Sequence, residues 1–262
     1  MTTLSNFDQA HGGLYGRTAL VTGSSRGIGL GIARRLAQED VRVVLHGRDH
    51  DRLRQAQQQL LSAGATVHTV AGDLENPQAV QQIRSEVIDA IGVPDILIAN
   101  AGGSDVAPGP IDELEVEDWS KTIAANLTAT FLTIRAFVPA MKQRGSGSVV
   151  TVSSTAVRIA DAQSPPAYSA AKAGIEMMTK TLAVQAGPRG VRANCVAPAT
   201  ILTETNTEAI PPDIQDQIAN TYPLRRLGTV NDVAEAVLFL ASETSAWITG
   251  TVIDVGGGSS AV

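Results

Sequence analysis

The chain has little cysteine, few aromatic residues and no excess of positive charge, and each shortage excludes a class of protein. Cys195 is the single cysteine among 262 residues, so no intramolecular disulfide can form. Aromatic residues make up 3% of the chain and the net charge is -6 at pH 7. Neither a basic surface for phosphate backbones nor stacking platforms for bases result from this composition. We therefore expect no nucleic-acid partner, and the four scattered histidines predict no metal site.

Long apolar runs are also absent. No segment approaches the roughly 20 consecutive apolar residues that a membrane-spanning helix requires. Residues 1–14 contain Asp8, His11 and several amides where a signal peptide would have an apolar core. We expect a loose N-terminal arm over residues 1–15, a cytoplasmic protein and no membrane partner. Cys195 lies in an apolar run, which favours a small packing residue over a nucleophile.

What the chain does have is a regular alternation of short apolar runs and amphipathic segments. Buried strands are expected over residues 18–22, 41–46, 66–70, 96–99, 148–153, 191–196 and 251–255. Helical periodicity separates them, with the longest helices expected over residues 119–144 and 167–186. Each parallel connection needs a crossover helix. We therefore predict an α/β protein whose residues 16–262 form a single-domain doubly wound Rossmann fold, a seven-stranded parallel sheet with helices on both faces.

Residues 203–222 interrupt this alternation. The segment is polar, contains Pro211 and Pro212, and follows the sixth expected strand. Ligands of such sheets bind outside the carboxyl ends of the strands. The segment is therefore predicted to be a substrate lid, and a solvated connector is the alternative.

Tyr168 and Lys172 are four residues apart in an expected helix, so they share one face. A free tyrosine hydroxyl ionises near pH 10, and a neighbouring ammonium favours the phenolate, so the pair is typical of an acid/base at neutral pH. Taken alone, this spacing is also that of a solvated aromatic residue and a surface cation. Ser153 is the last residue of the strand expected over residues 148–153, and Ser154 follows it. The carboxyl end of this strand should open onto the ligand cleft, so both hydroxyl groups come close to the Tyr168 and Lys172 pair.

Three glycines, Gly23, Gly27 and Gly29, lie between the first expected strand and the first helix. Missing side chains let backbone amides and a helix N-terminus approach a pyrophosphate. The spacing Gly-x-x-x-Gly-x-Gly departs from the common dinucleotide fingerprint Gly-x-Gly-x-x-Gly. A tight connection between strand and helix is the alternative, but the context favours a dinucleotide site.

The end of the second strand, around Gly47, selects the adenosine ribose in such folds. An NAD site presents a carboxylate that binds the ribose 2′-hydroxyl and repels a 2′-phosphate. Gly47 presents none, while Arg48 and Arg26 can donate charge-assisted hydrogen bonds to that phosphate. We predict NADP. The alternative is NAD, with Arg48 a surface cation paired with Asp49 or Asp51.

These motifs, in this order, resemble the short-chain dehydrogenase/reductase family from about Gly16 to Gly258, and its 3-oxoacyl-ACP reductase members in particular. The matching motifs are the glycine turn, Asp73-Leu74, Ala99-Asn100-Ala101-Gly102, Asn126, Ser154, Tyr168 with Lys172, Asn194 with Pro198, and Thr203. The resemblance implies NADP-dependent hydride transfer between nicotinamide and a carbonyl or secondary alcohol, such as a 3-oxoacyl thioester. It also implies a homotetramer that acts on a small molecule.

The resemblance further implies which residues form the site. The catalytic set would be Asn126, Ser154, Tyr168 and Lys172. The cofactor-binding set would be Gly23, Ser25, Arg26, Gly27, Ile28, Gly29, Arg48, Asp73, Leu74, Asn100, Ala101, Gly102, Tyr168, Lys172, Pro198, Ile201 and Thr203. Tyr168 would donate the proton and Ser154 would steady the developing oxyanion. Lys172 would also bind the nicotinamide ribose, Asn126 would hold a water relay, and Thr203 would meet the carboxamide.

The chain departs from the family pattern in two places beside the cleft. Ala199 stands where the family usually has glycine, and the spacing from Ser154 to Tyr168 is one residue longer than usual, which implies a small insertion around residues 160–166. Two other functions stay open. One is an NAD-dependent sugar, polyol or other alcohol dehydrogenase, and the other is a catalytically silent protein that senses the dinucleotide.

Overall fold

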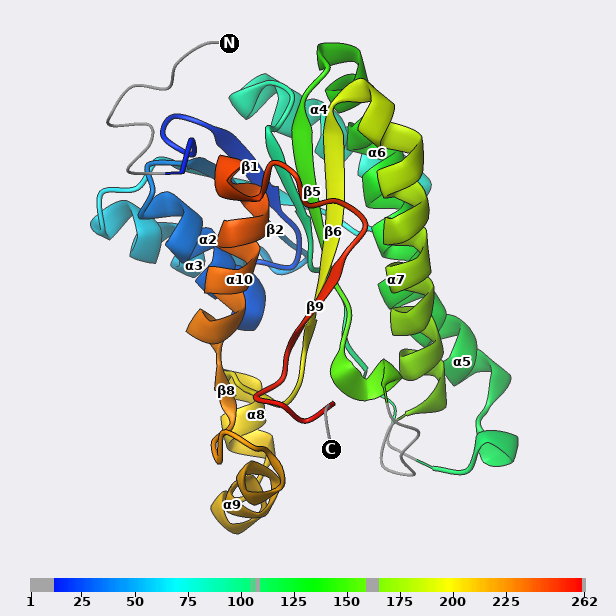
Figure 1. The fold of residues 1–262 in the computed structure, drawn as a ribbon. Helices are drawn as coiled ribbons and strands as arrows, with labels where there is room; N and C mark the ends of the chain where they lie inside the picture. Colours follow the sequence, from blue (N-terminus) through cyan, green and yellow to red (C-terminus); the bar gives the residue numbers. More distant parts are fainter. Residues whose placement is uncertain (1–11, 105, 107–108, 159–164, 261–262) are drawn as a thin grey trace.

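The computed structural model describes residues 12–104, 106, 109–158 and 165–260 (Figure 1). Its centre is a seven-stranded sheet in the order β3-β2-β1-β4-β5-β6-β9, with every neighbouring pair parallel. The strands are β1 (Thr18–Val21), β2 (Arg42–Gly47), β3 (Val67–Ala71), β4 (Ile96–Ala99), β5 (Gly147–Val152), β6 (Val191–Pro198) and β9 (Val252–Val255). The predicted fold class is confirmed, and the strand order reverses direction between β1 and β4.

Helices cover both faces of the sheet (Figure 1). One layer consists of α2 (Gly27–Ala37), α3 (His50–Ser62) and α10 (Val230–Ala241), and the other of α4 (Pro77–Ile91), α6 (Ala129–Arg144) and α7 (Pro166–Ala186). Two apolar clusters fill the spaces between sheet and helices. Val43 and Leu45 of β2 belong to one cluster and Val44 to the other. Successive strand residues point to opposite faces, so a sheet that is covered twice needs apolar runs without alternation.

The long helix expected over residues 119–144 is divided in the structure. It begins as α5 (Val116–Ile123), passes through a π turn at Ala124–Thr128, and continues as α6. The whole stretch of residues 116–144 is long and apolar enough to cross a membrane by length and composition, although half of its most apolar window is buried inside the protein. Since α6 packs against α4, β4 and β5, we attribute this apolar character to the core.

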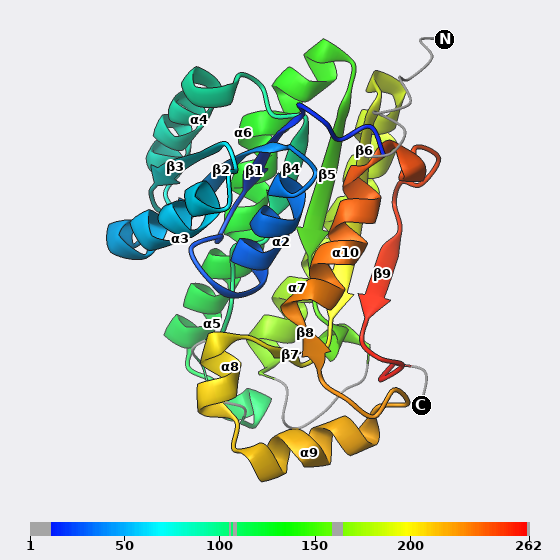
Figure 2. The ribbon, with the colours of Figure 1, turned by 90° about the vertical axis from the view of Figure 1, so that its left-hand side faces the viewer.

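The lid predicted over residues 203–222 folds as two helices, α8 (Glu204–Ala209) and α9 (Pro212–Thr221). Figure 2 shows them beyond the carboxyl ends of the sheet strands. A small parallel pair, β7 (Ile201–Leu202) and β8 (Gly228–Thr229), joins the two ends of the lid. Neither helix contains a buried residue, so both lie outside the two apolar clusters of the core.

Most of the predicted N-terminal arm, residues 1–11, lies outside the described residues. The remainder is packed rather than loose, because Leu14 is 2% exposed and belongs to the core. The carbonyl of Gly12 also accepts a hydrogen bond from the Glu243 amide at 2.9 Å. The ordered domain therefore extends N-terminal to residue 15.

Candidate active site

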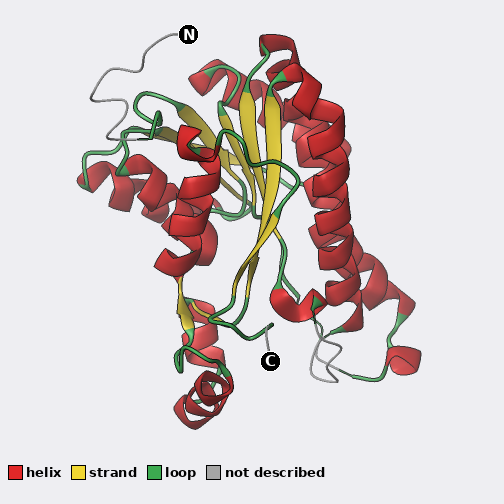
Figure 3. Ribbon diagram, in the orientation of Figure 1, coloured by secondary structure: helices red, strands yellow, loops and turns green. Residues whose placement is uncertain are grey.

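The residues predicted for the site gather along the carboxyl edge of the sheet. The glycine turn follows β1, Arg48 follows β2, and Asp73-Leu74 follow β3. Residues 100–102 follow β4, Ser154 follows β5, and residues 198–203 end β6 and enter the lid. Figure 3 shows these loops opening below the yellow strands. The crevice between β1 and β4, where the strand order reverses, is where open α/β sheets bind their ligands.

Tyr168 and Lys172 occupy the first two turns of α7 and lie together, as their spacing predicted. The Lys172 Nζ is 5.4 Å from the centroid of the Tyr168 ring, and it donates to the Val152 carbonyl at 2.9 Å. Lys172 is 3% exposed, whereas Tyr168 is half-buried. The ammonium is therefore held between the carbonyl of the last residue of β5 and the face of the tyrosine ring, in a cation–π arrangement.

Asn126 lies in the π turn between α5 and α6 and is fully buried. Its Nδ2 donates to the carbonyls of Gly103 at 2.7 Å and Thr122 at 2.9 Å, and its Oδ1 accepts from the Gly103 amide at 3.0 Å. The side chain thus ties the loop after β4 to the helix. π turns inside helices occur mostly at functional sites.

The position of Gly102 shows how closely the predicted groups converge. A β-carbon built there would lie 2.5 Å from Asn126 Oδ1 and 3.5 Å from Lys172 Nζ. Gly102 has a φ of +149°, a backbone conformation that side chains with a β-carbon rarely adopt. The loop after β4, the π turn and α7 therefore meet at one point only because residue 102 has no side chain.

The two adjacent serines have different surroundings. Ser153 is 2% exposed, and its Oγ lies 2.9 Å from Glu176 Oε1 and 3.1 Å from the Lys172 carbonyl. Ser154 is half-buried, and its Oγ accepts from the Ala156 amide at 3.2 Å. An oxygen that accepts retains its own proton for donation to a ligand. The geometry favours Ser154, the serine that the family resemblance implies, over Ser153 for substrate contact.

The glycine turn offers an anion site. Helix α2 begins at Gly27, its N-cap residue Arg26 makes no side-chain capping bond, and its first turn has no acidic residue. Amide groups at such a helix end attract phosphate. Gly23 has a φ of +64°, and a β-carbon there would lie 2.8 Å from Ala101 Cα. The turn therefore fits a dinucleotide pyrophosphate, with the loop after β4 packed beneath it.

Hydrogen bonds of the Asn100 and Thr22 side chains connect the glycine turn to the loop after β4. The Asn100 Nδ2 donates to the carbonyls of Thr22 at 2.9 Å and Gly23 at 3.2 Å. The Thr22 hydroxyl accepts from the amides of Asn100 at 3.0 Å and Ala101 at 3.1 Å. The Asn100 side chain thus helps to fix the shape of the glycine turn, which with the loop after β4 forms the cofactor cradle.

Arg48 follows β2, where an adenosine ribose would lie. Its surroundings test the alternative that it is a surface cation paired with Asp49 or Asp51. Its side chain is 74% exposed, and its nearest recorded carboxylate is Glu75, at 3.8 Å. Asp49 instead caps α3, and Asp51 pairs with Arg54 at 3.0 Å. Within the described residues, Arg48 forms no ion pair with Asp49 or Asp51, the two partners that the surface-cation alternative expects.

Other members of the predicted cofactor set are engaged within the protein. Arg26 donates from Nη1 to Thr205 Oγ1 of α8 at 3.3 Å, so a contact between this arginine and a ribose phosphate is not preformed. Thr203 caps α8 by accepting from the Asn206 amide at 3.2 Å. The side chains of Leu74 and Ile201 are buried, which leaves their main chains for ligand contact.

His46, at the end of β2, supports the glycine turn. The Gly23 amide donates to its Nδ1 at 3.3 Å, and its Nε2 lies 3.2 Å from the Gly72 carbonyl. We infer that Nδ1 is the acceptor and that Nε2 carries the proton. Burial lowers the pKa of His46 to about 4, against the opposing effect of the bond to Gly72.

Because His46 is buried with a lowered pKa, we predict that the free energy of unfolding decreases in acid. The native state does not protonate His46 until about pH 4, whereas an unfolded histidine binds a proton near pH 6.5. Between these values the unfolded state holds more protons, so stability falls as the pH is lowered. From pH 7 to pH 4.5, the wild type should lose about 2 kcal/mol more than a His46→Gln variant in urea unfolding. Equal losses in the two proteins would contradict the buried, neutral state of His46.

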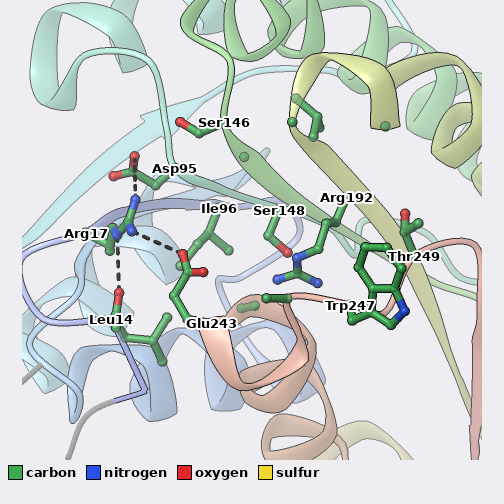
Figure 4. Close-up of a pocket in the computed structure, with 17 residues that line it drawn as sticks. Leu14, Arg17, Asp95, Ile96, Ser146, Ser148, Arg192, Glu243, Trp247 and Thr249 are labelled. Carbon is green, nitrogen blue, oxygen red and sulfur yellow. Dashed lines mark hydrogen bonds and ion pairs between the residues drawn. The ribbon is translucent and has the colours of Figure 1, made fainter. Parts of the chain in front are cut away.

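A separate hollow lies at the other edge of the sheet. Figure 4 shows its charged lining, at the amino ends of β1, β4, β5 and β6, and its volume is about 610 Å³. Arg17 pairs there with Asp95 at 3.7 Å and Glu243 at 3.2 Å. Arg192 donates to the carbonyls of Ser242 and Ile248. Because these charged groups are already paired or hydrogen-bonded, the hollow is not the candidate active site.

Sequence reasoning missed three charged residues behind the serine loop. Arg158 Nη2 contacts Asp254 Oδ1 at 2.6 Å, and Arg158 Nη1 contacts Glu176 at 2.9 Å. Glu176 lies one turn after Lys172 on α7, and this spacing was a signal that could have been used. No short-range pattern links Arg158 to Asp254, because 96 residues separate them. In addition, burial raises the pKa of the Cys195 thiol to about 11, which agrees with a packing role.

The fold and the site define an oxidoreductase with a Rossmann fold, and the comparisons identify its family. Residues 23–260 match the profile described as enoyl-(acyl carrier protein) reductase. An uncharacterized short-chain type dehydrogenase/reductase from Sinorhizobium fredii is 36% identical over 251 residues, covering 94% of this chain and 98% of the relative. The chain therefore belongs to the short-chain dehydrogenase/reductase family, as its motifs predicted.

Two characterised relatives show the chemistry of the family. D-beta-hydroxybutyrate dehydrogenase from Rhizobium meliloti is 36% identical over 258 residues, covering 92% of this chain and 98% of the relative. A gluconate 5-dehydrogenase from Burkholderia cenocepacia, solved with NADP and tartrate, has a TM-score of 0.89 at 29% identity, covering 97% of this chain and 99% of that one. The chain is accordingly an enzyme of alcohol and ketone substrates, and the predicted enzyme class is confirmed.

Proposed function

We propose that this protein is an NADP-dependent oxidoreductase that transfers a hydride between nicotinamide and a ketone or secondary alcohol. Its catalytic set is Asn126, Ser154, Tyr168 and Lys172. The observation that carries the proposal is the Lys172 ammonium, fixed 5.4 Å from the Tyr168 ring centroid at the carboxyl edge of the sheet. A buried cation that is paired with a half-buried phenol has little use in a protein that only senses a dinucleotide.

In the proposed reaction the nicotinamide supplies or accepts the hydride. During reduction, the Tyr168 hydroxyl gives its proton to the substrate oxygen, and the Ser154 hydroxyl donates a hydrogen bond to the same oxygen as negative charge develops. Lys172 stabilises the phenolate that remains and binds the nicotinamide ribose. Oxidation follows the same path in reverse. Asn126 orders the loop around Gly103 and relays protons through water, and the lid excludes bulk water from the cleft.

The preference for NADP rests on Gly47 and Arg48. Arg48 reaches solvent beside the cleft with one carboxylate contact at 3.8 Å, so its guanidinium can turn to a 2′-phosphate at little cost. Gly47 leaves the end of β2 without the carboxylate that would repel that phosphate. The NADP held by the gluconate 5-dehydrogenase supports this choice, whereas a 7 alpha-hydroxysteroid dehydrogenase of 28% identity and TM-score 0.88 was solved with NADH.

Replacing Arg48 tests the cofactor assignment. A charge-assisted hydrogen bond contributes roughly 1.5 to 3 kcal/mol, so Arg48→Ala should weaken NADP binding by about tenfold to a hundredfold and leave NAD binding nearly unchanged. Fluorescence titration with both cofactors measures this. Arg54→Ala, which removes an exposed arginine from the same region, is the matched control and should change neither affinity. A wild type with the higher kcat/KM for NAD would overturn the assignment.

Gly47→Asp is a less direct test of the same question. A β-carbon at Gly47 would lie 3.2 Å from Ser25 Oγ and 3.4 Å from Leu53 Cγ, so the glycine turn would have to shift slightly. A change of cofactor preference in this variant would combine charge with packing. Arg48→Ala avoids that ambiguity, because the arginine side chain is mostly exposed.

For the substrate, we propose a small molecule with a secondary alcohol or ketone, including 3-oxoacyl thioesters. The relatives named for hydroxybutyrate, glucose and gluconate support a panel of hydroxy acids, sugars and sugar acids. Absorbance of reduced nicotinamide, followed with both cofactors over that panel and the thioesters, identifies the class. Tight cofactor binding without turnover of any substrate would favour the sensing protein, and turnover of sugars with NAD would favour the alternative dehydrogenase.

We also propose a cytoplasmic homotetramer that has no membrane or nucleic-acid partner. Its support is the apolar surface left on α6 and α7, where Phe131 is 48%, Met177 63% and Val184 78% exposed. Exposed apolar side chains of this size favour a surface that a second copy covers. Sedimentation equilibrium tests this, and a monomeric mass would contradict it.

A further inference from the structure

Three charged side chains form a cluster behind the proposed catalytic serine. Arg158 Nε lies 3.0 Å from both carboxylate oxygens of Asp254, its Nη2 lies 2.6 Å from Asp254 Oδ1, and its Nη1 lies 2.9 Å from both oxygens of Glu176. The three side chains are 23%, 29% and 12% exposed in that order. Partly buried, forked contacts of this kind are stronger than surface ion pairs. They connect the loop after β5 with α7 and β9.

The cluster continues to the residue before the catalytic serine. Glu176 Oε1 lies 2.9 Å from the Ser153 hydroxyl, which also lies 3.1 Å from the Lys172 carbonyl. Ser153 therefore fixes the end of β5 to the helix that carries Tyr168 and Lys172. Through Glu176, this anchor shares a carboxylate with Arg158.

Ser154 consequently lies between two anchors on the same helix. Ser153 precedes it, and Arg158 follows it after one short 3-10 turn over Thr155–Val157. The Ser154 Oγ is oriented by the Ala156 amide within that turn. If the far end of the turn were released, the Ala156 amide would no longer fix the direction in which the Ser154 hydroxyl donates.

We propose that Arg158, held by Glu176 and Asp254, is a positioning residue of the reaction that sets the Ser154 hydroxyl against the oxygen protonated by Tyr168. This inference rests on the proposed role of Ser154. Arg158 itself touches neither substrate nor cofactor. A purely structural role, in which the cluster contributes only folding stability, is the alternative that an experiment must exclude.

The chain supplies a matched control for that alternative. Arg35 is 20% exposed and contacts two carboxylates, Glu39 and Glu235, each at 2.7 Å. It joins α2 to α10, on the other face of the sheet from α7. Arg35→Met and Arg158→Met thus remove equivalent interactions, but only the second lies next to the serine.

The experiment is a double-mutant cycle between Arg158→Met and Ser154→Ala. Alone, Arg158→Met should lower kcat by about tenfold to a hundredfold, because small misplacements of reacting groups have effects of that size. The dissociation constant of the cofactor should stay unchanged. In the Ser154→Ala background, the same substitution should lower kcat by less than about twofold, because the group that it positions is gone. Arg35→Met should lower the melting temperature by about as much as Arg158→Met does, but it should leave kcat unchanged.

Amide hydrogen exchange gives a readout that needs no substrate. Exchange of amides 154–158 should be faster in Arg158→Met than in the wild type and unchanged in Arg35→Met. If the wild type turns over no substrate, the proposed function fails, while exchange still decides whether Arg158 orders the serine loop. If Arg158→Met does not fold, Glu176→Gln replaces it in the test. This variant keeps an acceptor for the Ser153 hydroxyl, and it should lower kcat and speed the exchange of amides 154–158 less than Arg158→Met would. Unchanged exchange, an unchanged kcat, or an equal loss of kcat in the Ser154→Ala background would overturn the proposal.

Discussion

Tyr168→Phe is expected to lower kcat by about a thousandfold while cofactor affinity survives. The substitution removes one oxygen and keeps the ring over which the Lys172 ammonium lies. General acid/base groups contribute about 10² to 10⁴ in rate, and the Ser154 hydroxyl is far too weak an acid to replace the phenol. Steady-state kinetics with the best substrate, together with a fluorescence titration of the cofactor, measures both effects.

The control for this variant is Tyr15→Phe. Tyr15 is 51% exposed and lies before β1, at the amino edge of the sheet. Loss of its hydroxyl should leave turnover intact. If Tyr168→Phe keeps most of the wild-type rate, the proton comes from another group and the proposed mechanism is wrong.

Lys172→Met should impair both turnover and cofactor binding. Methionine fills a similar volume, so the change isolates the loss of the ammonium, which donates to the Val152 carbonyl and faces the Tyr168 ring. We expect kcat to fall by about 10² to 10⁴, as for loss of the acid/base group itself. The cofactor dissociation constant should rise by about tenfold or more, since a charge-assisted contact to the ribose is lost.

Comparison of the two variants separates the two roles of the lysine. Lys172→Met should raise the dissociation constant, whereas Tyr168→Phe should not. Lys180→Met, an exposed position farther along α7, controls for the loss of a positive charge from the helix. A Lys172→Met enzyme that binds cofactor as tightly as the wild type would contradict the proposed ribose contact.

The seven parallel strands could be predicted from the sequence because the evidence for them is local. Strands covered on both faces are continuous apolar runs, and β2 and β5 stand out in this way. Helix spacing predicted that Tyr168 and Lys172 lie together, and the apolar run before Ser154 predicted its place at the end of β5. The structure adds the reason for choosing Ser154, since the neighbouring hydroxyl of Ser153 is already engaged by α7.

The features that sequence reasoning missed depend on contacts between distant segments. The π turn at Asn126 is stabilised by the main chain of Gly103, 23 residues earlier, so helical periodicity alone predicted a regular helix. Arg158 contacts Asp254, which is 96 residues away in the sequence. The lid helices expose nearly all of their side chains and carry no buried stripe. Nothing in the local pattern of apolar residues encodes these arrangements.

The hydrogen bonds that join Asn100 and Ala101 to Thr22 and Gly23 have a kinetic consequence. Four hydrogen bonds hold the glycine turn and the loop after β4 in one arrangement. The conformational entropy of this cradle is therefore lost when the chain folds rather than when the cofactor arrives, which favours rapid and tight association. Among the described contacts, hydrogen bonds hold the lid near its two ends, around Thr203 and Arg26 at one end and between Tyr222 and Thr200 at the other. If residues 203–222 act as the proposed lid, their opening would be a slow step of each catalytic cycle, and the exchange of oxidised for reduced cofactor would wait for it.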